Sequence, residues 1–309
     1  MTRPILRTGS RFAAGAIDMV ERLLEVLGAI RADPVLGAAF VLHGGTALNM
    51  FLGELPRLSV DLDLMYVGAV ERAVMLRSRP GIDERFRAVV GKLGYAVRGT
   101  NHEHSGQTYK LRCDGDAIKI DISYLARVAL LEPILVTCAA ADPPLSFVML
   151  REPELWAGKV KALVERTAAR DLYDLYRLAG SSPHFLRNDL ARALVIRAIS
   201  ASHAFPSVGH PADALDRFST PAPDLADPLY AMLAIDDRPS FAEMIAAVTA
   251  LLEPLRAPSA DEAEYVRLLG HDSEYRPELL FRRWPAVQER ARLDPAMQWK
   301  VMNLRRRTP

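Results

Sequence analysis

The residues with the clearest chemical potential are three aspartates that lie within two short apolar stretches. Asp61 and Asp63 alternate with leucines in "SVDLDLMYV" (59–67), and Asp121 alternates with isoleucines in "AIKIDISYL" (117–125). Such alternation predicts β-strands, in which successive side chains point to opposite faces of the sheet. Each strand would therefore bury its apolar residues on one face and present its aspartates on the other.

Crowded carboxylates are destabilising unless something compensates their charge. A divalent cation is the natural compensation, and Mg²⁺ is usually held by a few carboxylates together with substrate phosphates. Lys119 would share the surface with these aspartates, and we expect it to form a salt bridge with them rather than to contact a substrate. Asp61, Asp63 and Asp121 are therefore candidate ligands of Mg²⁺ or Mn²⁺. The alternative is an acidic patch on a half-exposed sheet.

A glycine turn precedes the first of these strands. "AAFVL" (38–42) predicts a short buried strand that Gly44 and Gly45 end, and Thr46 can cap the helix that follows. A Gly-Gly turn lets backbone N–H groups approach a phosphate, and a helix N-terminus adds a favourable partial charge. The P-loop pattern is absent, and plain turn chemistry is the alternative. The Asp-x-Asp strand that follows makes a phosphate site the more specific interpretation.

A lysine and two aspartates occupy predicted helices further along the chain. In the helix 153–166, Lys159 lies on the apolar, inward-facing side, where it needs an anionic partner. That partner is either a triphosphate or a carboxylate of the chain itself. In the helix 170–179, Asp171 and Asp174 flank the apolar stripe one turn apart. Either one is a candidate site residue, and either one can instead pair with a neighbouring arginine.

Two domains are expected from the order of these elements. The first, 1–140, combines a helix at 12–31 with the strands above, a helix at 82–94, a β-meander and an edge strand at 134–138. "AAADPPLS" (139–146) is the predicted linker. The second domain, 145–309, carries only helical patterns, which cover 153–166, 170–179, 187–204, 241–252, 260–269 and 286–293.

Composition limits the classes of protein. The 309 residues carry a net charge of +1, and no apolar run approaches the ~20 residues of a membrane span. The amphipathic N-terminus is unlike a signal peptide, and two cysteines make neither a disulfide framework nor a metal site. We therefore expect a cytoplasmic protein that does not enter a membrane. The stretch from Arg276 to Pro309 holds nine Lys/Arg and three Asp/Glu, so this basic tail is either a nucleic-acid contact or a solvated helix face.

"GGTAL…RLSVDLDL" resembles the nucleotidyltransferase fold of the DNA polymerase β superfamily. More narrowly, it is similar to the AbiEii/AbiGii toxin nucleotidyltransferases, which include the MenT toxins. In that family a Gly-Gly turn is followed by Arg-x-Ser-x-Asp-x-Asp, which Arg57, Ser59, Asp61 and Asp63 match. A Lys-x-Asp motif matches Lys119 and Asp121, and a helical Lys and a later Asp fall within 154–176. The resemblance covers about residues 38–180.

The resemblance implies an α/β (α+β) fold, in which a polymerase β-type domain with a mixed sheet precedes an all-helical C-terminal domain. It also implies in-line displacement at the α-phosphate of an NTP. In this scheme Asp61 and Asp63 bind metal, and Asp121 either orients the attacking hydroxyl or completes the metal shell. The β- and γ-phosphates are held by backbone and side chains of Gly44, Gly45, Thr46, Arg57, Ser59 and Lys159.

As an activity, the resemblance implies an NTP:tRNA nucleotidyltransferase toxin that modifies the 3′ acceptor end of tRNA and so blocks aminoacylation. Nucleotidylation of a protein hydroxyl or of a small molecule such as an antibiotic is the enzymatic alternative, and a non-catalytic nucleotide- or partner-binding module is the third. A toxin requires a cognate antitoxin. A kinase antitoxin that phosphorylates Ser59 would place negative charge at the metal and triphosphate site and abolish activity.

Overall fold

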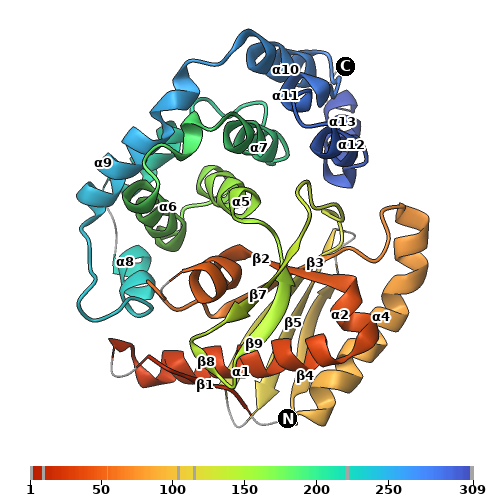
Figure 1. The fold of residues 1–309 in the computed structure, drawn as a ribbon, viewed down its shortest axis with the longest axis vertical. Coiled ribbons are helices and arrows are strands. Elements are labelled where there is room, and N and C mark those ends of the chain that lie inside the picture. Colours follow the sequence, from red (N-terminus) through yellow and green to blue (C-terminus); the bar gives the residue numbers. More distant parts are fainter. Residues whose placement is uncertain are drawn as a thin grey trace. The chain divides into compact units, whose positions relative to one another are not determined.

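A computed structural model describes residues 3–8, 11–53, 55–102, 105–113, 116–219 and 223–306. The chain forms two compact units, Met1–Arg151 with Ala231–Asp237 and Glu152–Tyr230 with Arg238–Pro309. Figure 1 labels most helices and strands of the two units. The first unit is α/β and the second is helical, which confirms the predicted fold class.

A seven-stranded mixed sheet forms the centre of the first unit, in the order β4-β5-β6-β3-β2-β9-β7. Two neighbouring pairs, β3 with β6 and β2 with β9, are parallel, and the others are antiparallel. The strands are β2 (Phe40–His43), β3 (Asp61–Tyr66), β4 (Ala96–His102), β5 (Gly106–Cys113), β6 (Asp116–Ser123), β7 (Ile134–Cys138) and β9 (Leu145–Met149). β1 (Ile5–Leu6) and β8 (Ala141–Asp142) pair separately.

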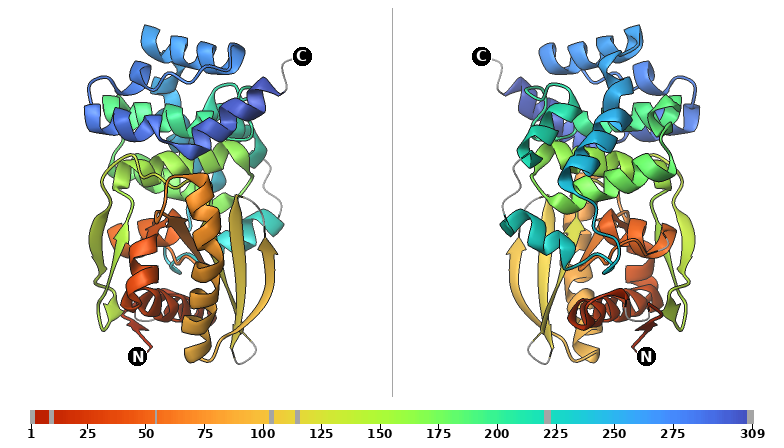
Figure 2. Two further views of the ribbon diagram at one scale, coloured as in Figure 1. Left: turned by 90° about the vertical axis from the view of Figure 1, so that its right-hand side faces the viewer. Right: turned by 90° about the vertical axis from the view of Figure 1, so that its left-hand side faces the viewer.

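Helices cover the apolar face of this sheet. α1 (Ala14–Ala32) contacts β6 and β9, and α4 (Arg72–Lys92) contacts β4 and α1 (Figure 2). Leu62 and Leu64 of β3 are fully buried, as are the alternate isoleucines of β6, because strand side chains of one parity share one face. α2 (Pro34–Ala39) precedes β2, and α3 (Gly44–Thr46) continues into the π-helix η2 (Ala47–Leu52).

The predicted linker at 139–146 is wrong. These residues form β8 and the start of β9, and the boundary between the units falls after Arg151. The sequence also gives no sign that 231–237 returns to the first unit, where the Leu58 N–H donates to the Met232 carbonyl at 2.9 Å. Residues 231–237 join the first unit through a few backbone hydrogen bonds, which leave no periodic pattern in the sequence. The predicted domain limits, 1–140 and 145–309, therefore do not include this segment in the first domain.

α4 begins ten residues before the predicted helix at 82. Pro80 lies inside it, and a proline followed by a glycine normally predicts a helix end. The helix continues through Pro80 because packing holds the turns before and after it. Met75 precedes the proline and Phe86 follows it, and both are buried.

The second unit is all-helical across its described residues, as predicted. Its helices are α5 (Glu152–Glu165), α6 (Ala169–Ser181), η3 (Phe185–Arg187), α7 (Asp189–Ser200), η4 (Pro211–Phe218), α8 (Pro223–Tyr230), α9 (Phe241–Leu252), η5 (Glu253–Arg256), α10 (Ala260–His271), α11 (Glu278–Phe281), α12 (Pro285–Arg292) and α13 (Pro295–Arg305). Among the helices that can be described, none has both the length and the apolar character needed to cross a bilayer.

Candidate active site

The two strands that carry the aspartates are direct neighbours. β3 and β6 are parallel, and their register places Asp61 beside Lys119 and Asp63 beside Asp121. All four side chains lie on the face opposite the buried leucines and isoleucines, and none of them is fully buried. The structure thus brings together the three carboxylates that alternation alone predicted to share a face.

Asp121 has both carboxylate oxygens engaged. The Thr108 hydroxyl donates to its Oδ1 at 2.5 Å, and Lys119 Nζ lies 2.5 Å from its Oδ2. Burial acts to lower the pKa of Lys119, but Asp121 and the charges of Asp61 and Asp63 raise it above its usual value. The predicted salt bridge is therefore confirmed, and Lys119 acts as an internal counter-ion of the carboxylate cluster.

No sequence motif marks Thr108 as a residue of the site. It lies on β5, where Gln107 and Tyr109 are buried on the helix-covered face and Thr108 lies on the other. The alternation of "GQTYKLRC" contains this information. The pairing of β5 with β6, which sets Thr108 opposite Asp121, does not follow from either strand alone.

The glycine turn passes directly against Asp63. Gly44 has a φ of +73°, and a Cβ at this position would lie 2.0 Å from Asp63 Oδ2, so only glycine fits here. Thr46 is buried, and its hydroxyl donates to the Asp61 carbonyl at 2.6 Å. The buried Asn49 donates to the Gly45 carbonyl at 2.9 Å. The Thr46 bond holds the turn onto β3, and the Asn49 bond fixes the turn to the helix that follows it.

A hollow of about 380 Å³ opens beside these residues, and His43, Asp63, Thr108 and Asp121 are among those that line it. Its polar lining includes two of the three predicted metal ligands. His43, at the end of β2, pairs in register with Asp63, which is why it reaches the same space.

The carboxylates suit a hard divalent cation by their chemistry, because Mg²⁺ prefers oxygen ligands and tolerates few of them from the protein. Within the described part of the chain, however, no three His, Cys, Asp or Glu side chains are gathered into a metal-holding group. Asp121 binds Lys119 instead. Asp61 and Asp63 therefore offer oxygen donors that fit a divalent cation by their chemistry, while the Asp121 carboxylate is held by Lys119.

Arg57 and Ser59 lie in the segment that leads into β3, and both side chains are buried. The Arg57 guanidinium donates to the Leu58 carbonyl at 2.9 Å, and its backbone bridges to Leu233. Their predicted contacts with a nucleotide remain predictions. Because Arg57 is buried and pairs with Leu233, it also has a structural role where the segment 231–237 packs on the first unit.

In the second unit, Lys159 lies with two aspartates in the interior. Its Nζ is 2.7 Å from Asp174 Oδ2 and 3.2 Å from Asp171 Oδ1, and all three side chains are at least nine-tenths buried. Arg166 Nε lies 2.7 Å from Asp171 Oδ2. Burial acts to raise the pKa of Asp171, but Lys159 and Arg166 hold it below its usual value. Of the two partners considered for Lys159, the carboxylate is confirmed, and both aspartates share it.

The structure places carboxylates on neighbouring strands of a mixed sheet, beside a glycine turn, as the resemblance to nucleotidyltransferases implied. The fold is similar to that of MenT4, a nucleotidyltransferase toxin from Mycobacterium tuberculosis H37Rv, with a TM-score of 0.61 and 17% identity over 90% of this chain and 92% of that one. No curated protein sequence matches the chain.

Residues 25–274 match the family described as nucleotidyl transferase AbiEii toxin, type IV toxin–antitoxin system. The chain therefore belongs to the AbiEii family of nucleotidyltransferase toxins. The resemblance inferred from the motifs is confirmed.

Proposed function

We propose that the protein transfers NMP from an NTP to the 3′ acceptor end of tRNA, with Mg²⁺ or Mn²⁺, and so blocks aminoacylation and translation. The observation that carries the transfer chemistry is the register of Asp63 with Asp121 beside Gly44. The choice of tRNA as acceptor follows from the family resemblance.

In this proposal, backbone N–H groups of the turn at Gly44 and Gly45 hold the β- and γ-phosphates. Asp121 orients the attacking hydroxyl and accepts its proton. The hydroxyl oxygen bonds to the α-phosphorus, the α–β phosphoanhydride bond breaks and pyrophosphate leaves. A metal bound by Asp61 and Asp63 would polarise the phosphate and stabilise the leaving group. Lys159, Asp171 and Asp174 are proposed site residues that, in addition, hold one another.

Ser59 is proposed as the point of control by a kinase antitoxin. Its side chain is 6% exposed, so a kinase would have to act on a conformation in which this segment opens. Phosphate at Ser59 would then add negative charge two residues before Asp61.

The test is a labelling assay with total tRNA, Mg²⁺ and each α-labelled NTP in turn. Asp61→Asn should lower label transfer by about 100-fold or more, the scale on which removing a transition-state electrostatic contact acts. Asp142→Asn, an exposed aspartate that pairs with Arg7, is the control and should transfer label normally. Pyrophosphate release without label on tRNA would move the acceptor to a protein or small-molecule hydroxyl. If no NTP gives label on tRNA or pyrophosphate release, the remaining interpretation is a non-catalytic binding module.

A further inference from the structure

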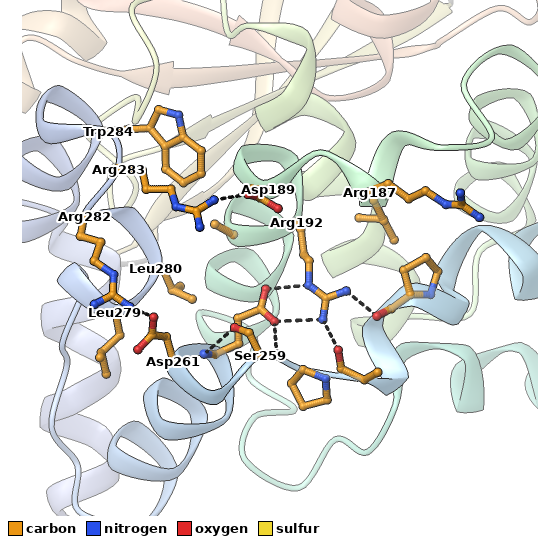
Figure 3. Close-up of a pocket in the computed structure, with 16 residues that line it drawn as sticks. Arg187, Asp189, Arg192, Ser259, Asp261, Leu279, Leu280, Arg282, Arg283 and Trp284 are labelled. Atoms are coloured by element: carbon orange, nitrogen blue, oxygen red, sulfur yellow. Dashed lines mark hydrogen bonds and ion pairs between the residues drawn. The ribbon is translucent and has the colours of Figure 1, made fainter.

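A second hollow, of about 530 Å³, lies entirely within the helical unit (Figure 3). It is lined by parts of η3 and α7, by the segment from η5 into α10, and by α11 and the residues after it. Four arginines line it together with one tryptophan, and they come from two stretches of sequence about ninety residues apart. They are Arg187, Arg192, Arg282, Arg283 and Trp284.

Arg192 is part of the frame. Its guanidinium bonds to both oxygens of Glu262, at 2.6 and 2.9 Å, and to the carbonyls of Ala257 and Pro254. With these partners its hydrogen-bonding capacity is largely used. Arg192 therefore ties α7 to α10 and builds the hollow without serving a ligand.

The other arginines are held loosely. Arg282 pairs with Asp261 and Arg283 with Asp189, and both arginine side chains are more than half exposed. Exposed pairs of this kind contribute ~0–1 kcal/mol, so a phosphate can replace either aspartate at little loss. Arg187, which also lines the hollow, is exposed. In Figure 3, Arg187 and Arg282 lie on opposite sides of Arg192.

The N-terminus of α10 opens on the same hollow but is already satisfied. Ser259 and Glu262 form a reciprocal capping box, with the Glu262 carboxylate accepting from the Ser259 N–H at 2.7 Å. A carboxylate in this place makes the helix end a poor site for a single phosphate. Any anion must therefore be bound by the spread guanidinium groups.

We propose that this hollow docks the phosphate backbone of an RNA, with a base stacked on Trp284. Spread, exchangeable guanidinium groups suit a polyanion with repeated phosphates, and an aromatic side chain beside them suits an unpaired base. The inference rests on the proposed function, in which RNA is the acceptor. It assigns that acceptor a binding surface in the helical unit, whereas Asp61, Asp63 and Asp121 belong to the first unit.

The experiment measures binding of total tRNA to the full chain, without NTP, across a range of salt concentrations. The double variant Arg282→Ala/Arg283→Ala should bind at least about tenfold more weakly, and its salt slope should fall by about two, one for each phosphate contact. Trp284→Ala should bind about fivefold or more weakly, from the loss of one stacked base.

Arg267→Ala/Arg276→Ala is the matched control. These arginines are also about half exposed and ion-paired, but they do not line the hollow, and their loss should leave tRNA binding within about twofold of the unchanged protein. Asp189→Asn/Asp261→Asn should act in the opposite direction and tighten binding, because it removes the carboxylates that compete with phosphate. If the ion pairs of Arg282 and Arg283 had only a structural role, the aspartate variant and the arginine variant would both bind tRNA more weakly.

Equal binding by the Arg282/Arg283 variant and its control would overturn the inference, as would no binding of tRNA by the unchanged protein. The inference would also be overturned if the same variants lost heparin binding to the same extent as tRNA binding, because the surface would then be a general polyanion site. The proposed function is judged separately by label transfer. If the hollow variants weaken RNA binding while no NTP labels tRNA, the docking surface stands and the proposed acceptor chemistry fails. If the hollow variants bind tRNA and label it normally, the docking surface fails and the proposed acceptor chemistry stands.

Discussion

Gly44 offers the sharpest test of how the glycine turn serves the carboxylates. In Gly44→Ala, a φ of +73° would be imposed on an L-residue, which destabilises by ~1–2 kcal/mol. The new Cβ would also meet Asp63 Oδ2 at 2.0 Å, Cγ at 2.7 Å and Cβ at 2.9 Å. Rotation about χ1 moves the first two atoms but not the third, so the backbone must shift as well. Overpacking of this kind adds ~1–3 kcal/mol.

Gly94→Ala is the matched control. Its φ is +87°, and a Cβ there meets nothing within 4 Å, so it carries the backbone strain alone. We expect Gly94→Ala to lose ~1–2 kcal/mol of unfolding free energy and to keep its activity. Gly44→Ala should lose ~2–5 kcal/mol and transfer label at least about 100-fold more slowly, because Asp63 is displaced.

The assays are urea unfolding followed by circular dichroism and label transfer to tRNA. A domain of this kind typically has ~5–15 kcal/mol of stability, so the circular dichroism spectrum at 25 °C is the check that Gly44→Ala is folded before its label transfer is compared. Indistinguishable unfolding and label transfer in the two variants would refute the argument that the close approach to Asp63, and not turn conformation alone, requires glycine.

Three further outcomes follow from the charged groups. The unfolding free energy that Asp171 adds over Asp171→Asn should be fully present above its unfolded pKa of ~3.9. It should shrink as pH falls below that value toward the lowered folded pKa, and urea midpoints between about pH 6 and 3 would show whether it does. Ser59→Glu should lose label transfer while Ser59→Ala, at the same buried position, keeps most of it; equal activity of the two would exclude control by charge there. Lys119→Met should lower the Mg²⁺ concentration that gives half-maximal label transfer, because the lysine charge, which interacts with Asp61 and Asp63 as well as Asp121, no longer competes with the metal; an unchanged or higher requirement would show that the lysine does not compete.

Period-two alternation predicted the central strands and the shared face of Asp61, Asp63 and Asp121, because side-chain parity follows from the backbone alone. Helical spacing likewise placed Lys159 on an inward face. What alternation lacks is the identity of the neighbouring strand. For that reason Thr108, one strand away from Asp121, and the return of 231–237 to Leu58 were missed. Both depend on pairing between segments far apart in the sequence.

The basic tail was predicted from composition, and composition could not separate its members by role. Lys300 is 7% exposed, and its Nζ donates to the carbonyls of Ser202 and Phe205 at 2.7 and 2.6 Å, so it is a structural tie. Arg282 and Arg283 are exposed, and each forms an ion pair with an aspartate on the surface. Residues 307–309 of the tail lie outside the described residues. Only the contacts reveal which charges are available to a partner.

Solvent exposure also distinguishes the two lysine–carboxylate clusters, one at Lys119 and one at Lys159. Lys119 is 45% exposed and Asp121 31% exposed, so solvent screens their pair and exchange of the lysine for another cation carries a small penalty. Lys159, Asp171 and Asp174 are 7%, 0% and 2% exposed, and removing one member of such a buried set typically destabilises by ~3–5 kcal/mol. Loss of Lys159 should therefore appear first in the unfolding free energy. Loss of Lys119 should appear in the metal dependence instead, because the half-exposed face of β3 and β6 is the place where an ion pair can open to admit a substrate.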